Sequence, residues 1–112
     1  MTYPQDQIDE LKRLFPGVSY ASESGFDYFL LPNVHLPPQC PSGPIDMLLC
    51  PNHREGYNSR LYFPEKIQCG RSPNWNGSTY IFDRQWYAFS WKLSEGLRLS
   101  QMVLSHMKGL QG

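Results

Sequence analysis

The sequence predicts an α+β fold, in which a four-stranded antiparallel meander is flanked by an N-terminal and a C-terminal helix. Two stretches with helical periodicity, residues 5–15 and 99–110, lie near the two ends of the chain. Between them, β-rich runs separated by turn residues extend from about residue 18 to residue 67. We therefore expect a single domain over residues 1–112, with both helices covering one face of a one-sided sheet.

The first helix is predicted by the spacing of its apolar residues. Between residues 5 and 15, one helical face carries Ile8, Leu11, Leu14 and Phe15. The charged residues among them fall on the other faces, as on an amphipathic helix that packs on a core. Pro16-Gly17 ends the helix, because proline cannot continue the hydrogen-bond ladder and glycine readily leaves the helical conformation.

The first two strands are predicted to form a hairpin. Residues 18–22 make the first strand, Glu23-Ser24-Gly25 turns the chain, and residues 26–31 form a mostly apolar second strand. Residues 31–38 contain three prolines, which remove donors from a ladder. We therefore expect this stretch to be an extended exit from the second strand and not part of a central strand.

The remaining elements follow the same logic. Residues 45–50 are a third, apolar strand, and residues 51–58 are a polar loop. Residues 60–67 form a fourth strand with edge character because it contains Pro64. An irregular loop is expected from about residue 69. The last helix is predicted by helical spacing of Leu99, Met102, Val103, His106 and Leu110.

The charge balance excludes several classes of function. Ten Lys and Arg residues balance ten Asp and Glu residues, so no net field attracts the chain to nucleic acid or to an anionic membrane. No apolar run approaches the ~20 residues of a membrane span, and the N-terminal residues lack the pattern of an export signal. We expect a cytoplasmic protein without a cofactor whose partners are other proteins.

The three cysteines are predicted to be reduced and metal-free. Their odd number and the lack of a Cys-x-x-Cys pair argue against a secreted disulfide framework. Cys50 and His53, together with Cys40 and Cys69, could supply four zinc ligands. Structural zinc sites usually use two closely spaced ligand pairs, and only one occurs here, so buried thiols are the better interpretation of Cys40 and Cys50.

Residues 69–86 carry the motif with the most functional information. Ser72-Pro73-Asn74 is followed by Asn76-Gly77 and then by Gln85-Trp86. This order resembles the active-site segment of the ubiquitin-conjugating enzyme (UBC-like) superfamily, which has a His-Pro-Asn tripeptide, an Asn-Gly turn, a catalytic cysteine and a later tryptophan. Counting back from the tryptophan places Ser78 at the cysteine position, whereas counting forward from the turn places Tyr80 there. Neither position holds a thiol.

The resemblance extends along most of the chain as an order of elements. It is similar to the short bacterial branch of the superfamily that is encoded with ubiquitin-like proteins. The residues that carry it beyond the motif are 29–32, Pro37-Pro38, 45–49, Tyr57 before 61–64, and 85–92. The resemblance implies a UBC-like fold and a ubiquitin-conjugating-enzyme-like role, in which the protein accepts or positions a ubiquitin-like protein from a ubiquitin-activating-type enzyme.

Ser78 is the first candidate for the transfer chemistry. In this interpretation Ser78 carries the tail of the ubiquitin-like protein as an oxyester, and Asn74 stabilises the oxyanion, as the resemblance implies for the family asparagine. A serine hydroxyl needs a positioned base, and His53 in the polar loop is the possible base. The plainer interpretation of Ser78 is a turn residue directly after Asn76-Gly77.

Two other interpretations of the site stay open. Cys69, at the end of the fourth strand, is an alternative nucleophile, although its plainer role is a core thiol. Alternatively, nothing is catalytic, and the domain is a non-catalytic UBC-like or RWD-like interaction module that binds a ubiquitin-like protein or its activating enzyme. A covalent adduct would distinguish an enzyme from a module that binds only reversibly.

Overall fold

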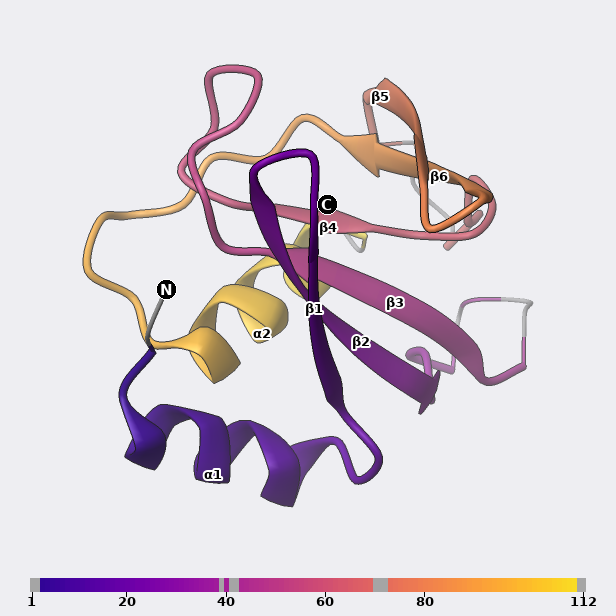
Figure 1. The fold of residues 1–112 in the computed structure, drawn as a ribbon. Helices are drawn as coiled ribbons and strands as arrows, with labels where there is room; N and C mark the ends of the chain where they lie inside the picture. Colours follow the sequence, from indigo (N-terminus) through magenta and orange to yellow (C-terminus); the bar gives the residue numbers. More distant parts are fainter. Residues whose placement is uncertain (1–2, 39, 41–42, 70–72, 111–112) are drawn as a thin grey trace.

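The computed structural model describes residues 3–38, 40, 43–69 and 73–110, and within them the chain forms two helices and two antiparallel sheets (Figure 1). The elements in chain order are α1 (Gln5–Leu14), β1 (Ser19–Glu23), β2 (Phe26–Val34), β3 (Ile45–Cys50), β4 (Arg60–Tyr62), β5 (Trp75–Ile81), β6 (Arg84–Phe89) and α2 (Leu99–Gly109). The first four strands pair in the order of the sequence, and β5 and β6 form a separate hairpin. The predicted α+β class, the two terminal helices and the antiparallel meander are therefore confirmed.

The meander departs from the prediction in β2. This strand continues past Leu31 to Val34, although it lies between β1 and β3 and contains Pro32. The pairing with β3 shifts register between Leu31 and Val34, and Asn33 there has a positive φ of 52°. Such a bulge interrupts the hydrogen-bond ladder locally. Pro32, which has no N–H to donate, is therefore tolerated there. The expectation that the chain leaves the sheet at Leu31 was wrong for this reason.

Both helices cover the same face of the meander, as predicted (Figure 1). The buried residues of this core include Leu11 from α1, Val103 from α2 and alternate residues of β2, β3 and β4. The helices are tied to each other by Arg98, whose guanidinium donates to Asp6 Oδ2 at 2.8 Å and to Glu10 Oε1 at 3.1 Å. Within the described residues, no helix is long and apolar enough to cross a membrane.

The opposite face of the sheet is covered as well, which the one-sided prediction missed. Ile81, Trp86 and Ala88 of the hairpin pack in a second core with residues of β2, β3 and β4. Met47 through Cys50 in β3 are all fully buried, because their side chains alternate between the helix core and the hairpin core. The sheet is therefore the middle layer between the helices and the hairpin.

The hairpin replaces the irregular loop expected after residue 69. It joins the meander where Phe63 and Tyr87 exchange backbone hydrogen bonds of 2.7 and 2.8 Å. This bridge follows directly after β4, which ends at Tyr62 and not at the predicted residue 67. The turn of the hairpin is Phe82-Asp83, where both residues have positive φ angles of 50° and 61°. A two-residue turn with these angles matches the twist of the flanking strands.

Candidate functional site

Ser78 lies in the middle of β5 and not in a turn. Asn76-Gly77, which the sequence analysis interpreted as a tight turn, lies in the same strand, where the pairing with β6 shifts register. The Ser78 side chain is exposed, and its Oγ accepts a hydrogen bond of 2.7 Å from Gln85 Nε2 on β6. The environment is that of a cross-strand pair on a solvent-facing hairpin.

Asn74 lies just before β5 and is also exposed. Its backbone carbonyl accepts a hydrogen bond of 2.7 Å from the N–H of Ser90. Ser78 lies four positions after Asn74 along nearly extended chain, which corresponds to about 13 Å at the rise of a β-strand. The strand therefore holds the two residues apart, whereas oxyanion stabilisation requires a donor about 3 Å from the reacting oxygen. Ser72 of the predicted tripeptide lies outside the described residues.

The cysteines differ most from the prediction. Cys40 and Cys69 form a disulfide across 29 residues of sequence, so the prediction that they are reduced was wrong. Cys69 is also buried, and a sulfur bonded to another sulfur is not the thiolate that a transfer enzyme requires. Cys50 is free and fully buried, and burial raises the pKa of its thiol. None of the three cysteines offers an accessible nucleophile.

His53 and His106 differ in their exposure and in their contacts. His53 is exposed in its loop, and its Nε2 atom lies 3.8 Å from Glu95 Oε1. The side chain that contacts the Ser78 hydroxyl is Gln85 and not His53, the predicted base. His106 is buried on α2, and its Nε2 atom lies 2.9 Å from the Ser59 hydroxyl oxygen. Burial, followed by the nearby Arg60 charge, lowers the pKa of His106 to about 4. The Ser59–His106 pair resembles a nucleophile and base, but both side chains are shielded from substrate.

The most extensive polar arrangement near the predicted site is centred on Arg60, a residue that the sequence did not single out. Arg60 is 2% exposed, and its guanidinium donates to Asn76 Oδ1 at 2.6 Å, to the Phe89 carbonyl at 3.1 Å and to Glu55 Oε1 at 3.2 Å. A Cβ atom at Gly77 would lie 3.2 Å from this guanidinium, so glycine leaves room for it. Arg60 therefore joins β4 to both strands of the hairpin.

Tyr57 extends this network to the surface. Its hydroxyl donates to Ser90 Oγ at 2.8 Å and accepts from Asn76 Nδ2 at 2.9 Å, while the Arg60 guanidinium lies 4.3 Å from its ring centroid. Hydrogen bonds with Ser90 and Asn76 lower the pKa of Tyr57, and Arg60 and Lys92 add to this effect. The sequence signals this network only through Arg60, a charged residue in the apolar run after Ser59. The partners of Arg60 come from segments that only the fold brings together.

The described residues contain no group of three or more His, Cys, Asp or Glu side chains arranged to hold a metal ion. Two of the four ligands considered for zinc, Cys40 and Cys69, are bonded to each other. The geometry around the predicted motif is therefore that of a hydrogen-bonded hairpin surface.

Comparison with known protein families finds none that matches this chain. No curated protein matches it. No solved structure matches it either. The UBC-like interpretation therefore depends on the motifs of the sequence and on the order of the structural elements.

Proposed function

We propose that this protein is a non-catalytic UBC-like interaction module, which binds a ubiquitin-like protein or its activating-type enzyme reversibly. The observation that carries the proposal is the state of the thiols: Cys40 and Cys69 are bonded to each other and Cys50 is buried. A thioester carrier requires a thiolate that the C-terminal tail of a folded protein can reach. This chain resembles the superfamily but lacks such a thiolate, which favours binding over transfer.

The arrangement of the elements supports the UBC-like part of the proposal. A helix, a four-stranded meander and a final helix follow one another in the order that the superfamily uses, with the β5–β6 hairpin between the meander and the final helix. The tryptophan of the motif, Trp86, is 2% exposed and packs between the hairpin and the sheet. Its role here is to hold the hairpin in place.

A second candidate function is an oxyester carrier that uses Ser78. The observation in its favour is exposure, because the Ser78 side chain lies on the surface at the position that counting back from Trp86 assigns to the nucleophile. The contact that Ser78 makes opposes it, since Gln85 Nε2 donates to its oxygen and an amide cannot remove the hydroxyl proton.

A reconstituted reaction distinguishes the two functions. The protein is mixed with ATP, a bacterial ubiquitin-like protein and its activating-type enzyme, and complexes are measured by analytical ultracentrifugation and by electrophoresis with and without thiol. We expect reversible binding without a higher-mass covalent species. Ser78→Ala is expected to bind equally well, because an exposed side chain contributes little to folding.

Three results would contradict this expectation. An adduct that survives thiol, is cleaved by hydroxylamine and is lost in Ser78→Ala would identify the oxyester carrier. An adduct that thiol destroys and Cys69→Ser prevents would move the role to Cys69. A lack of binding to either protein would reject the UBC-like module itself.

A further inference from the structure

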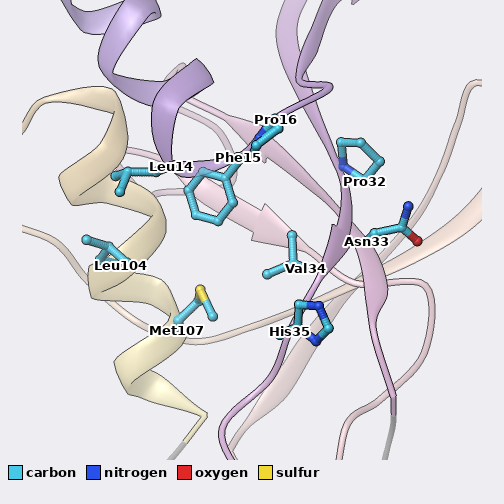
Figure 2. Close-up of a pocket in the computed structure, with 9 residues that line it drawn as sticks. All are labelled: Leu14, Phe15, Pro16, Pro32, Asn33, Val34, His35, Leu104 and Met107. Carbon is cyan, nitrogen blue, oxygen red and sulfur yellow. The ribbon is translucent and has the colours of Figure 1, made fainter.

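The outward face of α2 has a half-exposed leucine between two grooves. Leu104 is 50% exposed and lines both of them. The first groove, of about 550 Å³, runs between α2, the end of α1 and β2. In Figure 2, Leu104 and Met107 of α2 lie opposite Val34, and Leu14 and Phe15 close one end. The second groove, of about 530 Å³, lies between α2 and residues 91–97.

The side chains lining these grooves are apolar, neutral polar or cationic, and the second groove carries two lysines. Leu14, at the end of the first groove, is 50% exposed like Leu104. The second groove is lined by Trp91 and Leu97 and by two exposed lysines, Lys92 and Lys108. Among the described residues neither lysine takes part in an ion pair. No aspartate or glutamate lines either groove.

The carboxylates near these grooves have partners of their own, and Glu95, in the segment beside the second groove, lies 3.8 Å from His53. Asp6 and Glu10 of α1 both pair with Arg98 at the beginning of α2, and the Ser100 hydroxyl donates to Glu10 as well. Arg98 therefore holds both carboxylates at that end of the helix pair, away from Lys92 and Lys108. The opposite end of α2 carries Lys108 and has no acidic partner among the residues lining the groove.

We propose that the outward face of α2 binds an acidic amphipathic helix of a partner protein. Apolar side chains three or four residues apart on the partner would enter the grooves on the two sides of Leu104, which is the usual mode of helix recognition in a groove. Glutamates flanking them would pair with Lys92 and Lys108. The charge of the lining residues selects an acidic partner over a basic one. This proposal goes beyond the proposed function and does not depend on a ubiquitin-like partner.

The test uses the full chain and two synthetic helical peptides. In both peptides leucine recurs every third or fourth residue, and the polar positions are glutamate in one and lysine in the other. Trp91 lines the second groove, so its fluorescence reports binding there, and heteronuclear NMR identifies the residues that shift. We expect the acidic peptide to bind at least tenfold more tightly than the basic one, with an affinity that falls as salt increases.

Substitutions locate the binding site. Lys108→Glu is expected to weaken the acidic peptide about threefold or more, and Leu104→Ala by a similar factor, because an exposed ion pair and a half-buried leucine each contribute modestly. The matched control is Lys66→Glu, at an exposed lysine that lies near Tyr87 and lines neither groove, which should leave the affinity unchanged. The double variant Lys92→Glu with Lys108→Glu should bind the lysine peptide instead.

Several results would overturn the proposal. These are no binding of the acidic peptide at low salt, equal binding of both peptides, and an equal effect of Lys66→Glu. Self-association of the protein that Leu104→Ala abolishes would assign the face to a second copy. Binding to vesicles of anionic lipid, with none to the peptide, would assign it to a membrane surface.

Discussion

Acidification is expected to destabilise the protein through His106. This side chain lies on the buried side of α2 and is 2% exposed, and its ring lies within hydrogen-bonding distance of Ser59. Burial and the nearby Arg60 guanidinium lower the pKa of His106 from 6.5 to about 4. The folded protein therefore keeps the ring neutral at a pH at which the unfolded chain already binds a proton.

The sign and size of the effect follow from these two pKa values. Between pH 6.5 and about 4 the unfolded state binds more protons, so the free energy of unfolding falls as the pH falls. At roughly 1.4 kcal/mol for each pKa unit, the loss is about 2 kcal/mol at pH 5 and about 3 kcal/mol near pH 4. Either value is a large fraction of the 5–15 kcal/mol by which domains are typically stable.

Urea denaturation at a series of pH values from about 7.5 to 5 measures this loss. His106→Gln removes the titrating ring but keeps a polar group for Ser59, so its stability should be lower at neutral pH and nearly flat over the same range. Keeping the pH above about 5 limits the contribution of Asp6 and Glu10, whose pKa values Arg98 and Ser100 lower and whose stabilisation is lost in more acidic solution.

His53→Gln is the matched control, since it removes an exposed histidine whose contact with Glu95 lies on the surface. It should leave the pH dependence of the wild type unchanged. Parallel curves for the wild type and His106→Gln would refute the reasoning, and so would an NMR titration in which the His106 ring protonates near pH 6.5 in the folded protein.

Three further predictions concern stability and are checked by urea denaturation of each variant with circular dichroism as a test of folding. Gly109→Ala should lower the free energy of unfolding by about 1–3 kcal/mol, although alanine favours helices, because the new Cβ would lie 2.6 Å from Phe89 Cε1; increased stability would contradict this. Reducing the Cys40–Cys69 disulfide should cost about 3–4 kcal/mol through the freedom gained by the unfolded chain, and an unchanged midpoint would show that the bond is not formed. Arg60→Met should cost about 2–4 kcal/mol because the hairpin loses its buried donor, whereas a neutral effect would mean that packing alone holds the hairpin.

The elements with strong local patterns could be predicted from the sequence. The helical spacing before Pro16 predicted α1, which ends at Leu14, and the continuous apolar run at residues 45–50 predicted β3 with the observed bounds. Both signals are local, because a helix and a strand each repeat their buried positions within a few residues.

The hairpin could not be predicted because its turn lacks the usual residues. Asn76-Gly77 is a typical turn pair in sequence, yet it lies within β5, whereas the actual turn is Phe82-Asp83. The positive φ angles of that turn are imposed by pairing of the two strands and by Glu23, whose carboxylate accepts the N–H of Phe82 at 3.0 Å. Glu23 lies 59 residues earlier in the chain, so no local pattern contains this contact.

What the sequence by itself determined is the α+β class, the order of the helices and of the first four strands, and the absence of a cysteine at the motif. Only the tertiary structure decided that Cys40 pairs with Cys69, that Arg60 is buried between β4 and the hairpin, and that both faces of the sheet are covered. The physical reason is the range of the forces involved. Periodicity and turn preferences act between residues a few positions apart, whereas disulfides, buried charges and packed layers depend on distances between residues that are remote in the chain.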